Sequence, residues 1–141
     1  MNALFFGTGF WGKGAGSGPW FMADLEAGVW AGGTGSSNTV NSSLPSSNLP
    51  FAFGILKSSG STNYAIRVGD ASPAGGTLTT AYDGVTPKSL SNQGAIILGI
   101  SGDNSNSSQG TFFEGAITSG KPSNATDDLV LANVQAAKYG Q

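Results

Sequence analysis

Two acidic residues lie two positions apart in the stretch GPWFMADLEAGVW, residues 18–30, which otherwise holds aromatic, aliphatic and small residues. On a β-strand, residues two apart face the same side, so Asp24 and Glu26 share a face with Gly28 and lie in line with Trp20. Carboxylates this close repel each other, which raises one pKa and can divide the pair into an ionised and a protonated group. The pattern indicates acid–base chemistry on a sheet surface, but two acids on a solvated sheet face would show the same spacing.

Another acid follows the apolar run AIILGI in the segment AIILGISGDNSNSSQGTFFEGAIT, residues 95–118. We expect AIILGI to be a buried strand, so Asp103, with Gly102 before it, is held in a polar loop directly after the strand end. An aspartate in such a loop is most often a turn former or a cap. Glu114, after two phenylalanines, can face either surface of its strand. The segment therefore offers candidate acids without fixing their role.

The composition excludes several classes of function. A chain of 141 residues fits one domain, residues 1–141. Its net charge is -2 and it has no basic cluster, so it lacks the electrostatic footprint of a protein that binds nucleic acid or an anionic membrane. It contains no cysteine and no histidine, which removes disulfides, thiolate chemistry, the usual general base, cysteine and histidine metal ligands and every serine–histidine triad.

Low charge and abundant serine, threonine, asparagine and glycine are typical of an extracellular protein, and we expect this chain to be secreted. Three glycosylation sequons agree weakly with this, at Asn41, Asn106 and Asn124. No apolar run approaches the roughly 20 residues of a membrane-spanning helix, and the start of the chain lacks the features of a signal peptide. The sequence does not say whether the sequons carry glycan.

The glycine-rich run GKGAGSG, residues 12–18, resembles a nucleotide-binding loop only in composition. A phosphate loop must open a helix whose N-terminus meets the anion, whereas here Pro19 and an apolar strand follow. We expect a turn between strands, in which glycine adopts backbone conformations closed to other residues. Close approach of a ligand to this bare backbone is the alternative.

Short apolar or alternating segments separated by Gly, Pro, Ser and Asn clusters predict an all-β sandwich or barrel. We expect strands near residues 4–11, 19–31, 50–57, 63–68, 76–83, 94–100 and 111–118, with a long loop over 32–49. The tail SNATDDLVLANVQAAKYG predicts one closing helix. Its expected N-cap is Thr126, its first turn holds Asp127 and Asp128, its apolar positions are 130, 134 and 137, and Gly140 ends it.

Four blocks of the sequence resemble the catalytic domain of the α-L-arabinofuranosidase B family, glycoside hydrolase family 54. They include GPWFMADLEAGVW, NYAIRVGDASPAGGTLTTAYDG and GAIILGISGDNSNSSQGTFFEGAITSGKPSNATDDLVLANVQAAKY. The resemblance runs over residues 9–139 and covers about the C-terminal half of the family's catalytic sandwich. It implies a concanavalin-like jelly roll, here partial, and a secreted enzyme that releases terminal arabinofuranose from arabinan and arabinoxylan with retention.

The same resemblance implies the roles of individual residues. Glu26 corresponds to the nucleophile and Asp103 to the general acid/base, while Asp24, Trp11 and the Gly102 backbone would contact the sugar. The strand spacing, and not the resemblance, adds Trp20 as an aromatic wall. Retention requires two carboxyl groups about 5–5.5 Å apart, one to attack the anomeric carbon and one to protonate the leaving oxygen. Acids from two remote segments could meet in this way across a sheet face. No metal and no cofactor are implied.

Three departures from the family pattern leave other functions open. The family's adjacent cysteine pair is absent, Ala27 stands where the family has asparagine, and the upstream half of the sandwich is missing. The chain could therefore be a non-catalytic secreted protein that binds carbohydrate through Trp11, Trp20 and Trp30, or an immunomodulatory-type fungal protein. Unpaired strand edges also favour a homo-oligomer or pairing with the missing upstream half.

Overall fold

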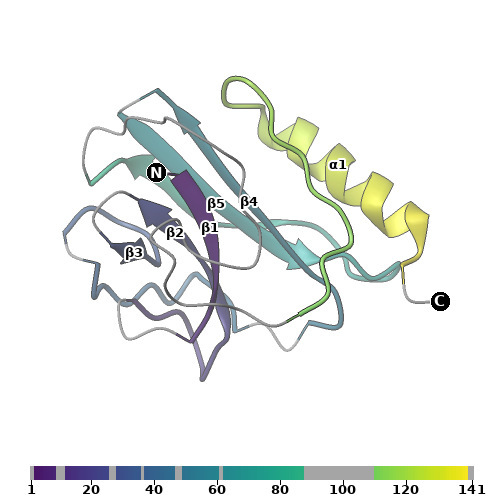
Figure 1. Ribbon diagram of the computed structural model, residues 1–141, viewed down its shortest axis with the longest axis horizontal. Helices are drawn as coiled ribbons and strands as arrows, with labels where there is room; N and C mark the ends of the chain where they lie inside the picture. Colours follow the sequence, from purple (N-terminus) through teal and green to yellow (C-terminus); the bar gives the residue numbers. More distant parts are fainter. Residues whose placement is uncertain are drawn as a thin grey trace.

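The computed structural model describes residues 2–8, 12–25, 28–35, 37–46, 49–60, 62–87 and 110–139. In this part of the chain, two antiparallel three-stranded sheets and one helix form three layers (Figure 1). The first sheet has the order β1 (Asn2–Gly7), β2 (Trp20–Leu25), β3 (Val29–Trp30), and the second β4 (Ala52–Ser59), β5 (Asn63–Asp70), β6 (Thr79–Val85). Helix α1 (Asn124–Ala137) covers the outer face of the second sheet. The expected β-sandwich with one C-terminal helix is confirmed.

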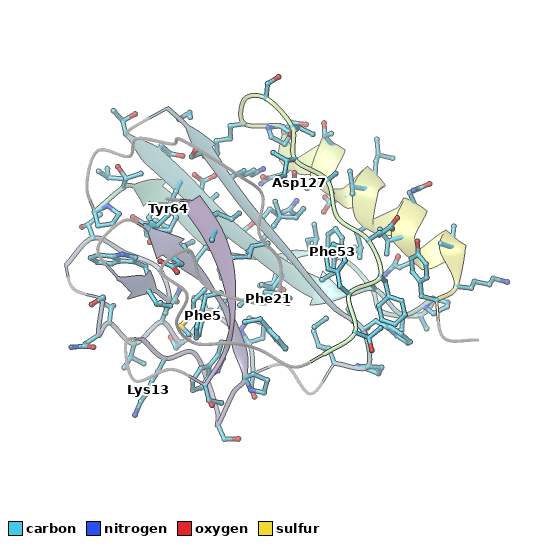
Figure 2. All side chains as sticks on the ribbon, in the orientation of Figure 1. Phe5, Lys13, Phe21, Phe53, Tyr64 and Asp127 are labelled. Carbon is cyan, nitrogen blue, oxygen red and sulfur yellow. The ribbon has the colours of Figure 1, made fainter. Side chains whose placement is uncertain are left out.

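The main core lies between the two sheets, where β1 lies against β4 and β2 against β5. Close approach depends on Gly54 of β4, since a Cβ atom there would lie 2.7 Å from Cδ1 of Phe21. On β5, Tyr64, Ile66 and Val68 alternate with outward-facing residues and are all buried in this core. Figure 2 shows Tyr64 among the strands and Asp127 at the start of α1. The inner face of β5 is therefore the central wall of the sandwich.

Helix α1 packs on the opposite face of the second sheet through Asp127, Leu131 and Val134, which are its buried residues. Of the expected apolar positions, 134 is buried as predicted, whereas 130 and 137 are exposed because positions 127 and 131 meet the sheet in their place. Ser123 is the N-cap in place of Thr126, and its hydroxyl accepts a hydrogen bond from the Thr126 amide at 3.1 Å. The helix is thus confirmed, with corrected ends.

The C-terminal end of α1 is also tied to the sheet layer. Lys138 is the C-cap in the left-handed conformation, and the expected stop at Gly140 falls outside the described residues. The Gln135 side chain donates hydrogen bonds to the carbonyl oxygens of Asp70 and Gly76, at 3.0 and 3.1 Å. None of the described helices is long and apolar enough to cross a membrane.

Two of the expected strands are wrong in form. Residues 19–31 make two strands, β2 and β3, joined by a reversal of the chain, and residues 111–118 form an exposed extended segment without strand pairing. Four expected strands are confirmed with shifted bounds, as β1, β4, β5 and β6. The expected strand 94–100 lies outside the described residues. The described part of the glycine run contains the turn that was expected, and Lys13 forms an isolated bridge with Val40.

Candidate functional site

Asp24 lies near the end of β2, in a tight hairpin with β3. It is opposite Ala3 on one side and Val29 on the other, and its side chain is half-buried. The Leu25 amide donates to the Gly28 carbonyl oxygen at 3.0 Å, which closes the hairpin directly after Asp24. Gly28 therefore belongs to the turn and does not continue the strand face of Asp24, contrary to the sequence prediction.

At the first residue of β2, Trp20, the glycine-rich segment covers the strand face that also carries Asp24. Trp20 is 4% exposed, and its indole N–H donates to the Ala15 carbonyl oxygen at 2.7 Å. Gly14 permits this cover, since a Cβ there would lie 2.6 Å from Cδ1 of Trp20. Trp20 is thus a core residue and not an exposed aromatic wall for a sugar. Trp30 is 7% exposed, so sugar binding through these two tryptophans is not favoured either.

The Asn41 side chain connects the segment after β3 to strand β6 through two hydrogen bonds. Its Nδ2 atom donates to the carbonyl oxygens of Ala31 at 2.9 Å and Ala81 at 3.0 Å. The register of β5 and β6 shifts next to Ala81, and Asn41 supplies a partner for its carbonyl at this irregularity. The backbone N–H of Asn41 also donates to the Lys13 carbonyl oxygen at 2.8 Å. One side chain therefore joins the segment after β3 to the second sheet.

Tyr64 adds a second link between the second sheet and the segment after β3, because its hydroxyl donates to the Gly33 carbonyl oxygen at 2.9 Å. Burial raises the pKa of Tyr64 well above its ordinary value, and the nearby Tyr82 raises it further. The pKa of Tyr82 is raised by burial and then by Asp83, and its hydroxyl donates to Val85 at 2.8 Å. Both phenols therefore act as neutral hydrogen-bond donors to the backbone.

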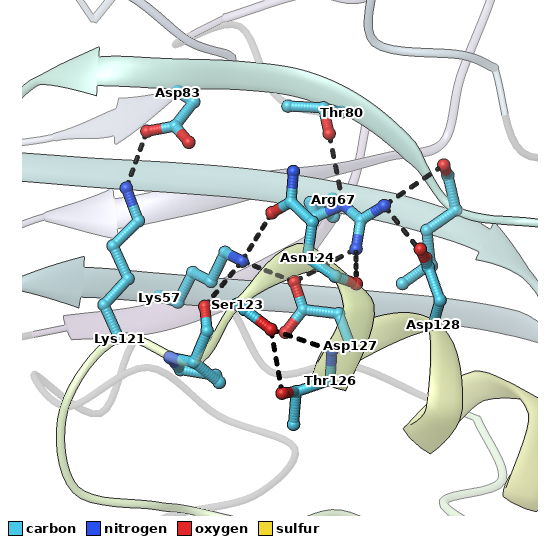
Figure 3. A network of polar contacts seen from close by, with 12 residues as sticks. Lys57, Arg67, Thr80, Asp83, Lys121, Ser123, Asn124, Thr126, Asp127 and Asp128 are labelled. Carbon is cyan, nitrogen blue, oxygen red and sulfur yellow. Dashed lines mark hydrogen bonds and ion pairs between the residues drawn. The ribbon is translucent and has the colours of Figure 1, made fainter.

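The largest polar cluster joins the second sheet to the start of α1 (Figure 3). Lys57 of β4 donates to Asp127 Oδ2 at 2.5 Å, to Asn124 Oδ1 at 2.7 Å and to the Pro122 carbonyl oxygen at 3.0 Å. The Lys57 and Asp127 side chains are both almost completely buried. All three ammonium hydrogens therefore have protein partners.

Arg67 of β5 completes this cluster from the neighbouring strand. Its Nη1 donates to Asp127 Oδ2 at 3.1 Å and to the Asn124 carbonyl oxygen at 2.9 Å, while Nη2 donates to Asp128 Oδ1 at 2.9 Å. Its Nε donates to Thr80 Oγ1 at 3.1 Å. Because protein groups satisfy the charges, the cluster is a structural anchor and not a substrate site.

Sequence reasoning missed this cluster. Lys57 and Arg67 are each the only basic residue of their strand and follow apolar or small residues, and that is the only signal they leave in the sequence. Their partners lie on the helix about 60–70 positions later along the chain. A more exposed pair lies beside the cluster, where Lys121 contacts Asn63 and donates to Asp83 at 2.6 Å. The hydrogen bond from Lys121 is the main cause of the lowered pKa of Asp83.

Of the residues predicted for the hydrolase site, Asp24 and Trp20 are the ones that the structure describes. Glu26, Asp103, Trp11 and Gly102 lie outside the described residues, so their roles stay predictions. Within the described ranges, no group of three acidic residues is placed to hold a metal ion. The described residues on either side of position 26 are thus those of the β2–β3 hairpin, which the bond from Leu25 to Gly28 closes.

Comparison with known proteins identifies the family. A model of the catalytic domain of α-L-arabinofuranosidase B matches residues 1–140. The chain belongs to the α-L-arabinofuranosidase B family. It is 49% identical over 145 residues to a probable α-L-arabinofuranosidase B of Aspergillus fumigatus, covering 99% of this chain and 28% of that protein. An α-L-arabinofuranosidase of Hypocrea jecorina is 49% identical over 146 residues, with the same coverage of both chains.

Solved structures of the α-L-arabinofuranosidase family share this fold. One is a Glu-to-Gln variant of a glycoside hydrolase family 54 α-L-arabinofuranosidase soaked with 4-nitrophenyl α-L-arabinofuranoside, with a TM-score of 0.88 and 43% identity. Another is an arabinofuranosidase complexed with arabinofuranosyl-α-1,2-xylobiose, with a TM-score of 0.87. Each comparison covers 98% of this chain and 29% of the other. The sequence resemblance is confirmed, and the chain spans less than a third of its relatives.

Proposed function

We propose that this chain is the acid-bearing part of a secreted, retaining α-L-arabinofuranosidase that acts on terminal arabinofuranosyl residues of arabinan or arabinoxylan. The observation that carries the proposal is the match of the family's catalytic domain to residues 1–140, a range that contains both Glu26 and Asp103. Relatives solved with arabinofuranosyl ligands support the substrate class.

In the proposed mechanism, Glu26 attacks the anomeric carbon and forms a glycosyl-enzyme, while Asp103 protonates the leaving oxygen. Asp103 then removes a proton from the water that hydrolyses the intermediate. Asp24 accepts hydrogen bonds from sugar hydroxyls beside the nucleophile, and Trp11 and the Gly102 backbone complete the pocket. The hairpin closed by Leu25 and Gly28 supports this arrangement because it fixes the backbone on both sides of residues 26 and 27.

The remaining part of the catalytic domain is the partner that we propose for the β1 edge of the first sheet, which pairs with no further strand among the described residues. Leu4 and Phe6 of the edge strand β1 are 44% and 43% exposed. Phe6 lies on the same side of the sheet as Phe21, with ring centroids 4.6 Å apart, and this side faces the second sheet. Inward-facing apolar side chains at an open edge are normally covered. Relatives more than three times as long have polypeptide available for this.

The test measures release of 4-nitrophenol from 4-nitrophenyl α-L-arabinofuranoside. We expect activity when residues 1–141 are joined to the rest of a family catalytic domain, and a loss of at least about 10³-fold in Glu26→Gln, because the nucleophile is removed. Glu114→Gln, which changes an exposed acid, is the matched control. Activity of Glu26→Gln equal to that of the unchanged protein would reject the proposed role. Full activity of residues 1–141 alone would reject the need for a partner.

A further inference from the structure

Two of the three N-glycosylation sequons lie in the described part of the chain, and the fold treats their asparagines differently. One is Asn41-Ser42-Ser43 in the loop beside the hairpin, and the other is Asn124-Ala125-Thr126 at the start of α1. N-glycosylation replaces one hydrogen of the side-chain amide by the sugar and leaves the amide oxygen as an acceptor. The use of each amide atom in the fold therefore decides whether a glycan can be accommodated.

The Asn41 amide nitrogen has no hydrogen to give up. Its two hydrogens are donated to Ala31 at 2.9 Å and to Ala81 at 3.0 Å, so a glycan would break at least one of these bonds. Space is also lacking, because a Cβ atom at Gly32 would lie only 2.5 Å from Asn41 Nδ2. The Oδ1 atom accepts from the Ser43 amide at 3.0 Å, which fixes the orientation of the group. This sequon is incompatible with a glycan in the folded protein.

In the Asn124 side-chain amide, the fold uses the oxygen atom and not the nitrogen. Its Oδ1 accepts from the buried Lys57 ammonium at 2.7 Å, and its Nδ2 makes no hydrogen bond to any described residue (Figure 3). The residue is exposed, as are its neighbours Ser123, Ala125 and Thr126. A sugar on Nδ2 would extend into solvent and would leave the bond from Lys57 intact.

We propose that Asn124, and not Asn41, carries an N-linked glycan when the chain passes through a eukaryotic secretory pathway. In the reaction, an oligosaccharide is transferred from a lipid-linked diphosphate donor. The bond from the sugar C1 to the phosphate oxygen breaks, a C1–Nδ2 bond forms, and the lipid diphosphate leaves together with the one proton that the amide loses. This inference rests on the secretion part of the proposed function, but it does not depend on the acids or on catalysis.

The test is the site of glycan attachment on residues 1–141 secreted from yeast, with Asn106→Gln as the background because that sequon lies outside the described residues. Enzymatic removal of N-glycans in heavy-oxygen water marks each occupied asparagine for mass spectrometry. We expect the mark at Asn124 only. A marked Asn41 in the folded, secreted protein, or an unmarked Asn124, would overturn the proposal.

Matched variants remove each sequon without touching its asparagine. Thr126→Ala is expected to lower the mass by one glycan, and Ser43→Ala to leave the glycan mass unchanged, because Asn41 carries no glycan. Ser43→Ala keeps the hydrogen bond to Asn41 Oδ1, because its donor is the Ser43 backbone. If secretion fails, translation with a signal sequence into microsomes gives the same mobility comparison, and a shift lost in Ser43→Ala would contradict the proposal. Hydrolase activity is measured separately, so its absence would count against the proposed function and not against this site.

Discussion

The Oδ2 atom of Asp127 lies 2.5 Å from the Nζ atom of Lys57, and both side chains are almost fully buried. Arg67 donates to the same oxygen at 3.1 Å, so one carboxylate lies between two cations from neighbouring strands. Burying a charge is costly unless it is paired and hydrogen-bonded, and removal of one partner leaves the others uncompensated. The attachment of α1 to the second sheet therefore depends on this carboxylate.

Asp127→Asn is expected to lower the free energy of unfolding by about 3–5 kcal/mol, because it leaves Lys57 and Arg67 buried without their common counter-charge. Asp128→Asn is the matched control. The Asp128 side chain is 45% exposed and, among the described residues, forms an ion pair with Arg67 alone, so we expect a loss below about 1 kcal/mol. Urea denaturation followed by circular dichroism measures both values. Equal losses in the two variants would contradict the central role of Asp127.

The sequence predicted the helix but not this anchor. Acidic residues at a helix start are explained by the macrodipole alone, so Asp127 and Asp128 gave no reason to expect that one would be buried. The distinction arises because the helix face meeting the sheet includes Asp127 with Leu131 and Val134. The partners come from strands far earlier in the chain, and only the folded arrangement brings them together.

Gly28→Ala is expected to destabilise the hairpin that leads to Glu26. Gly28 has φ of 148°, and a Cβ atom there would lie 2.8 Å from Cβ of Ser37, so the change adds both backbone strain and a clash. We expect a loss of about 1–3 kcal/mol. Gly35→Ala, which meets open space, is the control and should change little.

The steric and backbone parts of the Gly28→Ala effect can be separated with a second change. Ser37→Gly in the Gly28→Ala background removes the clashing atom, so thermal denaturation should show partial recovery. No recovery would mean that the loss comes from the backbone alone.

The prediction of a single strand over residues 19–31 was wrong at this same turn. Alternating apolar and polar residues continued through the reversal, so periodicity did not reveal it, while the permissive backbone of Gly28 was the available signal. Trp20 was misplaced for a related reason, because the glycine-rich segment 12–18 packs over its ring instead of leaving it open. The family motifs were recognisable because they are local in sequence, whereas cover by a loop is a tertiary property.

Asn41→Ala is expected to cost about 2–4 kcal/mol of folding free energy, because the carbonyl groups of Ala31 and Ala81 both lose a donor. Ser42→Ala removes an exposed neighbouring side chain and serves as the control. Chemical denaturation of the two variants under identical conditions makes the comparison. A loss below about 0.5 kcal/mol in Asn41→Ala, the range usual for surface changes, would show that the link between sheets is dispensable.

Tyr64 makes stability depend on alkaline pH. Its folded pKa is raised by burial, so above the unfolded tyrosine pKa of about 10 the unfolded chain releases a proton that the folded chain keeps. The folded state then binds more protons than the unfolded state, and the free energy of unfolding falls as pH rises. This contribution is fully present below about pH 10 and is lost progressively above it.

Tyr64→Phe is therefore expected to flatten the alkaline decline measured by urea denaturation from pH 8 to pH 11, although it lowers stability at neutral pH by about 1–3 kcal/mol through loss of the bond to Gly33. Tyr82→Phe is the matched comparison. Its pKa is also raised, but its ring is less buried, so its removal should flatten the decline less. Lysines that titrate in the same range are common to all three proteins and cancel in the comparison. An identical alkaline slope in the unchanged protein and Tyr64→Phe would mean that this buried hydroxyl ionises as readily in the folded chain as in the unfolded one.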